Sequence, residues 1–209
     1  MKIDDLLMRV HSVAITGHVK PDGDCIGSVL ALYNYLQKNA PQIHTSAFLE
    51  TPDQTFCYLQ NFDQINSHFD EERIYDLMIV LDCASRERLG KAERYFASAR
   101  KTVCLDHHVS NDQFCDENYV FGGMSSACEV LYGFLNHDRM DRAVAECLYT
   151  GIVTDTGVFK YESANAQTIR VVADLMEFGI HTGFIIDEAF FAKNFNESRI
   201  LGYALMKSR

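Results

Sequence analysis

Positive charge is scarce in this 209-residue sequence, and long apolar runs are missing from it. There are 19 lysines and arginines against 29 aspartates and glutamates, a formal net charge of −10. This balance excludes a general nucleic-acid coat, a reader of long duplex nucleic acid and a polybasic membrane anchor, because each needs positive charge to neutralise phosphates. No apolar run approaches the roughly 20 residues of a membrane span, and the first residues, MKIDD, carry acids where a signal peptide has basic and then apolar residues. We therefore expect a cytoplasmic protein without membrane contact.

Cysteine pairs and proline-rich linkers are missing as well. The seven cysteines form no Cys-x-x-Cys pair, which argues against a zinc knuckle, and their odd number argues against a disulfide framework. With three prolines and no low-complexity tract, the sequence offers no domain boundary before about residue 185. We expect one domain over residues 1–185 and a helical connector over residues 186–209.

Short apolar runs alternate with stretches of helical period in the first half of the chain. The repetition predicts an α/β fold: a parallel β-sheet with right-handed crossovers and helices on both faces, as in Rossmann-like three-layer folds. Helices have room over residues 25–36 and in the tract 56–74. The predicted strands are residues 13–16, 45–49, 77–81 and 102–105.

After Val120 the pattern becomes mostly helical. Gly179 follows one of the helical segments as a stop signal, and the last stretch, residues 197–209, is helical in pattern too. We expect this half to cover the sheet. The predicted helices are residues 125–135, 142–152, 166–178 and 182–191.

Acidic and histidine residues recur after the apolar runs. Ligands of parallel sheets bind at the carboxyl ends of the strands, so we expect these side chains to lie together. Two adjacent histidines at the end of a buried strand would cost desolvation energy without a partner, which favours a metal ion or a phosphate. Taken singly, Asp-Gly-Asp is also common in exposed turns, and an aspartate after a strand can cap a helix. The clusters are His18, Asp22 and Asp24; Asp82; Asp106, His107 and His108; and Asp155.

The donor types in these clusters indicate which metal they suit. Carboxylate oxygens with imidazole nitrogens favour Mn²⁺, with Mg²⁺, Fe²⁺, Co²⁺ or Zn²⁺ less favoured. Gly23 supplies a tight turn between Asp22 and Asp24, so that the two carboxylates can face two adjacent ions. The helix that begins near Cys25 would direct its N-terminal amides toward a phosphate.

With these motifs in place, the sequence resembles a known family, the DHH phosphoesterases. Four segments are similar to the family's motifs and occur in the family's order, over nearly the whole chain. The similarity is greatest to the branch of bacterial oligoribonucleases that are also 3′-phosphoadenosine 5′-phosphate phosphatases, and it covers the N-terminal catalytic domain only. The four segments are residues 17–28 (GHVKPDGDCIGS), 81–85 (LDCAS), 105–108 (LDHH) and 151–157 (GIVTDTG).

The resemblance implies a set of metal ligands. Two Mn²⁺ ions held side by side can share a hydroxide, lower its pKa and clamp the phosphoryl oxygens during in-line attack. The family therefore implies a two-metal hydrolase. Its implied ligands are His18 and Asp22 for one ion, Asp24, His107 and Asp155 for the other, and Asp82 as the bridge between them.

The resemblance also gives roles to residues beside the ligands. His108 would donate a hydrogen bond or a proton to the phosphate or to the leaving oxygen. Asp106 would orient the histidines without binding metal itself. Ser125 and Ser126 precede a predicted helix, where they could donate to the substrate or could simply cap that helix.

The sequence departs from this branch of the family in two places. Cys25 stands where the branch usually has alanine, a small change in volume that should not disturb the ligands. The family's smaller C-terminal domain, with its Gly-rich and basic substrate loop, is not found in these residues. Recognition of the substrate across an interdomain cleft would then be missing.

The resemblance implies a Mn²⁺-dependent phosphoesterase, often a homodimer, that degrades short RNA from the 5′ end and removes the 3′-phosphate of 3′-phosphoadenosine 5′-phosphate. Inorganic pyrophosphatases are an alternative with similar ligands, although their first motif differs from Asp22-Gly23-Asp24. A linear or cyclic dinucleotide phosphodiesterase is another. Outside the enzymes, the chain could be a metal- or nucleotide-binding module, which tight nucleotide binding without turnover would indicate.

Overall fold

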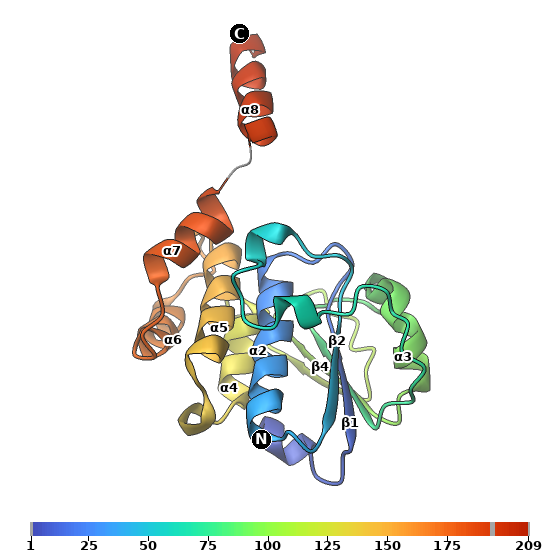
Figure 1. Ribbon diagram of the computed structural model, residues 1–209. Helices are drawn as coiled ribbons and strands as arrows, with labels where there is room; N and C mark the ends of the chain where they lie inside the picture. The colour runs from blue at the N-terminus through green and yellow to red at the C-terminus, as the bar shows by residue number, and fades with distance from the viewer. Residues whose placement is uncertain (1, 193–194, 209) are drawn as a thin grey trace.

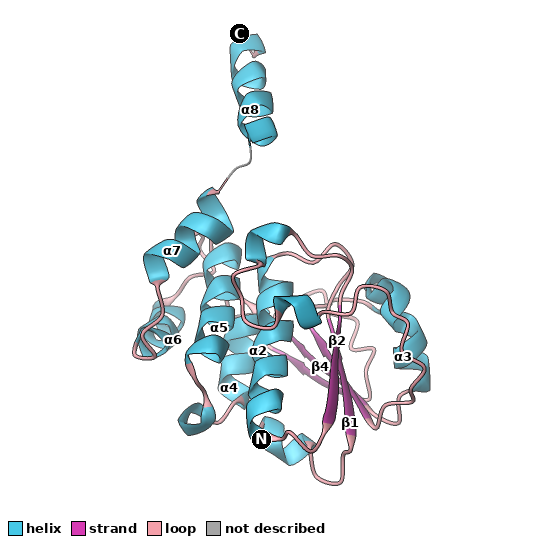
Figure 2. Ribbon diagram, in the orientation of Figure 1, coloured by secondary structure: helices cyan, strands magenta, loops and turns pink. Residues whose placement is uncertain are grey.

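The sheet of this protein has five strands, all parallel, in the order β2-β1-β3-β4-β5. The computed structural model describes residues 2–192 and 195–208 (Figure 1). Helices flank the sheet, which confirms the predicted α/β class (Figure 2). The strands are β1 (Ser12–Thr16), β2 (His44–Phe48), β3 (Leu77–Leu81), β4 (Thr102–Asp106) and β5 (Glu117–Val120).

The four predicted strands lie within one residue of β1 to β4, whereas β5 was not predicted. All of the residues of β5 are only half-buried, and its sequence, ENYV, contains no apolar run. It lies at the edge of the sheet, with Glu117 opposite Val103 of β4. An edge strand of this kind carries too little hydrophobic pattern to be recognised from sequence.

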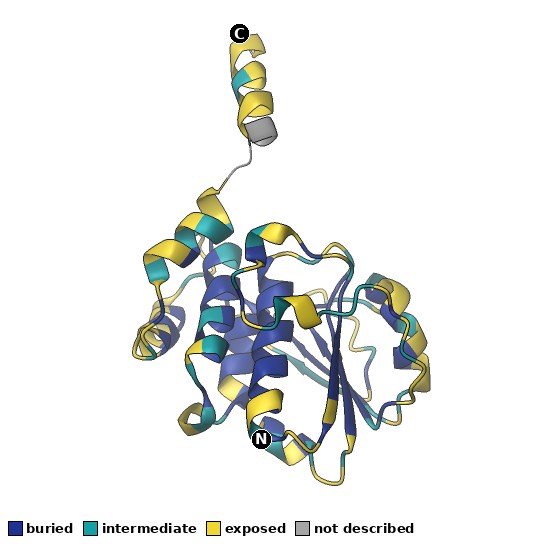
Figure 3. Cartoon of the chain, in the orientation of Figure 1, coloured by how far each residue is buried: buried dark blue, intermediate teal, exposed yellow. Residues whose placement is uncertain are grey.

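One face of the sheet is covered by α2 (Gly23–Asn39), α4 (Ala127–Phe134) and α5 (Arg142–Asp155). Alternate strand residues point to opposite faces. Val13 and Ile15 of β1 accordingly belong to the larger hydrophobic core under these helices, and Ala14 belongs to a second core on the other face. Figure 3 shows α2 and α5 buried along much of their length.

The opposite face carries η3 (Arg86–Ala92), a 3₁₀ segment, and α3 (Glu93–Ser98). Aromatic rings fill the space beneath them. Phe48 stacks on Tyr95 with 4.2 Å between ring centroids, and Tyr75 meets Tyr95 edge-on. Helices therefore cover both faces, as the sequence predicts.

Residues 56–74, all of which the structure describes, contain no α-helix, and that prediction is wrong. Two 3₁₀ turns are found there instead: η1 (Gln54–Phe56) overlaps the start of the segment, and η2 (Phe62–Gln64) lies inside it. Asn61, before η2, is left-handed with φ 63°. The side chain of Asn66 accepts hydrogen bonds from the amides of His68 and Phe69. Such side-chain contacts offer the backbone an alternative to the helix.

The second half is helical, as predicted, with α4, α5 and α6 (Ala166–Met176) on the predicted segments. Gly179, with φ +72°, lies past the end of α6, where a left-handed residue ends a helix. The segment 182–191 forms α7 (Thr182–Ile186) and a π-helical turn, η5 (Asp187–Phe191). Two short elements complete this part of the fold, α1 (Ile3–Leu6) and η4 (His137–Arg139).

Helix α8 (Phe195–Lys207) stands apart from the other elements (Figure 1). Its exposed apolar side chains include Ile200, Tyr203 and Met206. The division into a domain over residues 1–185 and a connector over 186–209 stays a prediction, and residues 193–194 and 209 of that connector lie outside the described residues. In the described ranges, no helix is both long enough and apolar enough to cross a membrane.

Candidate metal centre

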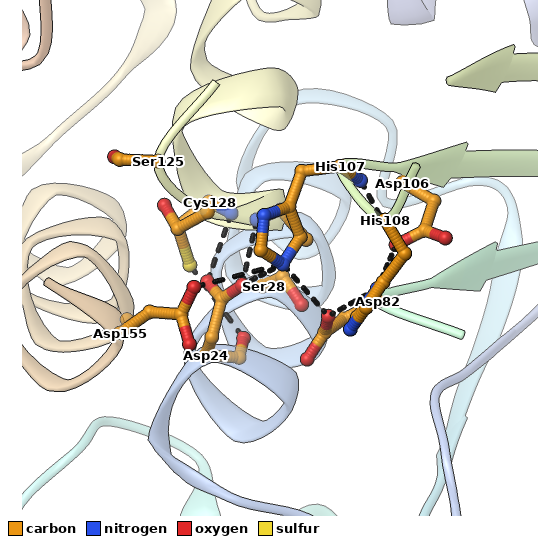
Figure 4. Close-up of polar contacts among 12 residues, drawn as sticks. Asp24, Ser28, Asp82, Asp106, His107, His108, Ser125, Cys128 and Asp155 are labelled. Atoms are coloured by element: carbon orange, nitrogen blue, oxygen red, sulfur yellow. Dashed lines mark hydrogen bonds and ion pairs between the residues drawn. The ribbon is translucent and has the colours of Figure 1, made fainter. Parts of the chain in front are cut away.

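Three neighbouring strands bring polar residues to one edge of the sheet. β1, β3 and β4 lie side by side and run in one direction, so their carboxyl ends meet. His18 follows β1, Asp82 comes directly after β3, and Asp106 is the last residue of β4. Figure 4 shows Asp24, Asp82, His107 and Asp155 close together at this edge. The parallel topology therefore assembles the residues that the sequence singled out.

The loop between β1 and α2 is held from both sides. The amide of Val19 donates to the carbonyl oxygen of Arg88 at 2.8 Å, and the amide of Lys20 donates to Oε2 of Glu50 at 2.9 Å. Nδ1 of His18 lies 2.8 Å from the carbonyl oxygen of Val19. With the proton on Nδ1, Nε2 of His18 is left as a metal-binding nitrogen.

Asp22 caps α2 and also faces His18. Its Oδ1 accepts from the amides of Asp24 and Cys25 at 3.2 and 3.1 Å. These amides are thus bonded within the protein, which corrects the expectation that this helix end binds a phosphate. Oδ2 of Asp22 lies 3.7 Å from Nε2 of His18, and the side chain is 62% exposed. The carboxylate can therefore cap the helix and bind a metal ion at once.

Asp24 is buried and is held by the N-terminus of α4. Its Oδ2 accepts from the amide of Ala127 at 2.6 Å, and its Oδ1 accepts from the amide of Cys128 at 3.0 Å. The partial positive charge of a helix N-terminus favours a carboxylate there. Gly151 of α5 provides the space that the Asp24 carboxylate occupies, because a Cβ at that position would lie 2.6 Å from Oδ1 of Asp24.

Asp82 lies between two histidines. Its Oδ2 is 3.4 Å from Nε2 of His18, and its Oδ1 is 3.6 Å from Nε2 of His107. The residue is left-handed, with φ 50°, a conformation in which aspartate is enriched among residues other than glycine. The two oxygens therefore face two different groups of donors.

The second group of donors comes from three elements. Nε2 of His107 lies 3.9 Å from Oδ2 of Asp24 and 3.6 Å from Oδ2 of Asp155. Asp155 is the last residue of α5. The ligand atoms of these three residues lie within 4.8 Å of one another, close enough to share one ion.

Cys25 lies near the candidate ligands His18 and Asp82 but is itself a poor metal ligand. Its Sγ is within 4.8 Å of the ligand atoms of His18 and Asp82. Burial, with the charges of Asp82 and Asp22, raises the pKa of the Cys25 thiol well above its ordinary value. Because the thiolate is the form that binds metals, this favours an inert thiol.

Asp106 is buried and fixes the loop that carries both histidines. Its Oδ1 accepts from the amide of His107 at 2.9 Å and lies 2.8 Å from Nδ1 of His108. Its Oδ2 accepts from Nδ2 of Asn111 at 2.6 Å. Both carboxylate oxygens of Asp106 are therefore occupied by contacts that orient this loop. Nδ1 of His108 also lies 3.6 Å from Oδ1 of Asp82.

The histidines and carboxylates change one another's pKa values. Burial lowers the pKa of His18, but hydrogen bonds with Asp22 and Asp82 outweigh it and raise the pKa to about 10. Burial also lowers the pKa of His107, but Asp82 and Asp24 raise it to about 9. Burial would raise the pKa of Asp82, yet the two histidines hold it well below its ordinary value.

The pKa values of two other carboxylates shift the opposite way, first through burial and then through the negative charge of neighbouring carboxylates. Burial and the charges of Asp82 and Asp155 raise the pKa of Asp24 well above its ordinary value. Burial raises the pKa of Asp155 to about 6, with Asp82 adding to the rise and His107 opposing it. A divalent cation would relieve this repulsion, and the oxygen and imidazole donors fit Mn²⁺, Mg²⁺ or Co²⁺.

Ser125 and Ser126 are fully buried at the start of α4. Oγ of Ser126 accepts from the amide of Glu129 at 3.0 Å, so Ser126 is the helix cap. Oγ of Ser125 donates to Oε2 of Glu129 at 2.6 Å, and Thr168 donates to the same oxygen at 3.0 Å. Both serine hydroxyls are therefore buried and hydrogen-bonded inside the protein, and their contact with a substrate stays a prediction.

Sequence reasoning missed the residues that support the ligands, namely Asn111, Glu129 and Gly151. Asn111 is a single polar residue in a loop and carries no distinguishing signal. Glu129 does carry one, because a glutamate among the apolar residues of a buried helix is unusual unless it has partners. Gly151 lies within the predicted helix 142–152, one residue before its end, and a glycine inside a helix usually has a packing or functional reason.

Comparison with known proteins gives a matching family model and several similar proteins. A model described as the DHH family, N-terminal domain, matches residues 12–152. The bifunctional oligoribonuclease and PAP phosphatase NrnA of Bacillus subtilis (strain 168) is 26% identical over 187 residues, covering 87% of this chain and 58% of that protein. The probable bifunctional oligoribonuclease and PAP phosphatase NrnA of Streptococcus mutans is 28% identical over 169 residues, covering 80% and 53%. The chain thus spans somewhat more than half the length of these relatives.

Among solved structures, an exopolyphosphatase-related protein from Bacteroides fragilis is similar to the whole fold. The TM-score is 0.88 with 24% sequence identity, over 98% of this chain and 63% of that one. At this identity the likeness concerns the fold alone.

Proposed function

This chain belongs to the DHH family through its N-terminal domain, and from that premise we propose that it is a metal-dependent phosphoesterase acting on short oligoribonucleotides and on 3′-phosphoadenosine 5′-phosphate. The names of the relatives from Bacillus subtilis and Streptococcus mutans support this substrate class. The donor set of the candidate metal centre supports the metal dependence.

The observation that carries the proposal is the position of Asp82. One carboxylate oxygen faces His18 and the other faces His107, which supports a bridging role for this side chain between two ion sites. When bound, two Mn²⁺ ions, with Mg²⁺ or Co²⁺ as substitutes, supply Lewis acidity and an activated water for in-line attack on phosphorus. The proposed ligands are His18, Asp22 and Asp82 for one ion, and Asp24, Asp82, His107 and Asp155 for the other.

His108 is the proposed proton donor. Its Nδ1 is bonded to Asp106, and its side chain is 32% exposed, so that it can reach a substrate. The carboxylate of Asp106 raises the pKa of His108, although burial opposes this. A protonated imidazole can give its Nε2 proton to the leaving oxygen of the ester. Asp106 acts through the two histidines and does not touch the substrate.

The proposal is tested by measuring phosphate or mononucleotide release with Mn²⁺ from short RNA, 3′-phosphoadenosine 5′-phosphate, a cyclic dinucleotide and pyrophosphate. EDTA and the Asp82→Asn variant serve as controls. Release from the first two that both controls abolish supports the proposal. Release from pyrophosphate or the cyclic dinucleotide alone selects another branch. Nucleotide binding without release from any substrate would indicate a binding module.

A homodimer and a cytoplasmic location remain predictions, to be checked by sedimentation and by localisation in cells.

A further inference from the structure

Arg88 has an unusual environment among the arginines of this acidic protein. Two arginines in the described residues are half-buried, Arg88 and Arg139. The guanidinium of Arg139 pairs with Asp4 at 3.1 Å and donates to the carbonyl oxygen of Asn39 at 2.9 Å. The guanidinium of Arg88 has no hydrogen bond or ion pair with any of the described residues. A half-buried arginine loses part of its hydration and usually recovers it from a partner.

The backbone of Arg88 is fixed beside the candidate metal centre. Its carbonyl oxygen accepts from the amide of Val19 at 2.8 Å, and Val19 follows the candidate ligand His18. Gly90, two residues later, has φ +54°, and a Cβ there would lie 2.4 Å from Cγ1 of Val19. The 3₁₀ segment η3 therefore packs tightly on the loop that carries His18 and Asp22.

No carboxylate of the described structure pairs with Arg88, although η3 packs on the loop that carries His18. The ion pairs of the candidate ligand aspartates in the described structure are with histidines. The N–H donors of Arg88 are thus not used by any of the described residues.

We propose that Arg88 binds a second, non-scissile phosphate of the substrate, while the scissile phosphate lies at the metal centre. The inference rests on the proposed function and names the feature that the substrate must carry. The guanidinium presents several N–H donors in a planar fork that suits a phosphate. In 3′-phosphoadenosine 5′-phosphate the 5′-phosphate plays this part, and in short RNA a neighbouring phosphate does. Substrates with a single phosphate leave Arg88 unused.

The test compares 3′-phosphoadenosine 5′-phosphate with adenosine 3′-monophosphate, which has the same scissile group and lacks the second phosphate. KM and kcat are measured for the wild type, Arg88→Met and Arg88→Lys. Arg88→Met should raise KM for the first substrate about 10-fold or more, and it should change KM for the second less than about 2-fold. Arg88→Lys should restore part of the loss, because it keeps a point charge and loses the fork.

The matched control is Arg73→Met, since Arg73 is exposed and has no ion pair or hydrogen bond of its side chain in the described structure. All variants should keep the wild-type melting temperature and the wild-type affinity for Mn²⁺. An unchanged KM for the two-phosphate substrate in Arg88→Met, or equal losses on both substrates, overturns the inference.

Calorimetric binding separates this inference from the proposed function. If the wild type hydrolyses neither substrate, the proposed function fails. The affinities of wild type and Arg88→Met for 3′-phosphoadenosine 5′-phosphate then decide about Arg88. Weaker binding by the variant supports the proposed contact of Arg88 with the second phosphate, whereas equal binding or no binding by either protein overturns it.

Discussion

The carboxylate of Asp24 accepts a hydrogen bond from the backbone amide of Ala127, with 2.6 Å between Oδ2 and N, across 103 residues of sequence. One residue lies in the first turn of α2 and the other begins α4. A candidate ligand is thus held by a helix from the second half of the chain. The geometry of the centre depends on how α4 and α5 pack against α2.

We expect Gly151→Ala to damage the centre through this packing. The added Cβ would meet Sγ of Cys128 at 2.3 Å and Oδ1 of Asp24 at 2.6 Å, inside a close-packed core. Overpacking of this kind costs about 1–3 kcal/mol of stability, and displacement of Asp24 should weaken metal binding. Urea unfolding and Mn²⁺ titration measure the two effects.

Gly133→Ala is the matched control for that substitution. Gly133 lies in α4 with no heavy atom within 4 Å of a built Cβ, and it is exposed. Replacing an exposed helical glycine should add about 0.5–1 kcal/mol of stability and leave metal affinity unchanged. Equal behaviour of the two variants would contradict the role given to Gly151.

Asp82→Asn should abolish turnover and leave the fold intact. Asparagine has the same shape and tolerates the left-handed backbone at this position, but its neutral amide cannot bridge two cations. We expect a fall in kcat on the order of 10³-fold or more. Asp138→Asn, at an exposed position, is the control. Circular dichroism checks the fold, and near-normal rates in Asp82→Asn would exclude a bridging carboxylate.

The stability of the metal-free protein should fall as the pH rises above neutrality. The folded pKa values of His18 and His107 are raised to about 10 and about 9 from an ordinary value of 6.5. The stability from their protonated forms is complete below pH 6.5 and is lost as the pH passes the folded values. Melting temperatures in EDTA from pH 6 to about 10 measure this loss.

Metal binding should show the reverse pH dependence. An ion replaces the protons on the two imidazoles, so affinity for Mn²⁺ should increase with pH and binding should release protons. The variant His18→Asn should lose part of both effects, while the exposed His68→Asn should keep them. A melting temperature in EDTA that is level or rises between pH 7 and pH 9 would contradict the first of these two expectations, namely the loss of stability of the metal-free protein.

Glu129→Ala should destabilise the junction of α4 and α6. Oε2 of Glu129 accepts from the amide and hydroxyl of Ser125 and from the hydroxyl of Thr168. Each buried donor left without an acceptor costs roughly 1–3 kcal/mol. Glu129→Gln keeps one acceptor and should lose less, and Glu177→Ala, at an exposed position, should lose little. Denaturant midpoints that do not differ between Glu129→Ala and Glu177→Ala would show that these hydrogen bonds matter little.

The parts of this structure that could be predicted from sequence are those with a strong local pattern. The run of β3 is wholly apolar up to Leu81, that of β4 is apolar from Val103 to Leu105, and parallel topology alone brings Asp82 and Asp106 to one edge. The half-buried β5 and the turns of residues 56–74 lack such a pattern. There, hydrogen bonds of individual side chains such as Asn66 determine the backbone conformation, and no periodic sequence pattern indicates them.

The site shows the same division. Ligand types could be recognised because aspartates and histidines follow the strands, but their supports come from distant segments. No spacing predicts that Asp24 meets Ala127, or that Val19 meets Arg88. The serines at the start of α4 were ambiguous, and only the position of Glu129 showed their hydroxyls to be internal.

The candidate ligands are spread over the chain from His18 to Asp155, on the ends of β1, β3, β4 and α5 and the start of α2. A growing polypeptide therefore lacks the complete pair of proposed ion sites until Asp155, at the end of α5, has left the ribosome. Shorter nascent fragments offer scattered carboxylates and imidazoles with ordinary, weak affinity for divalent ions. On the proposed ligand set, binding of the second ion would be a late event in the maturation of this protein, because it needs the sheet and its helices to be assembled together.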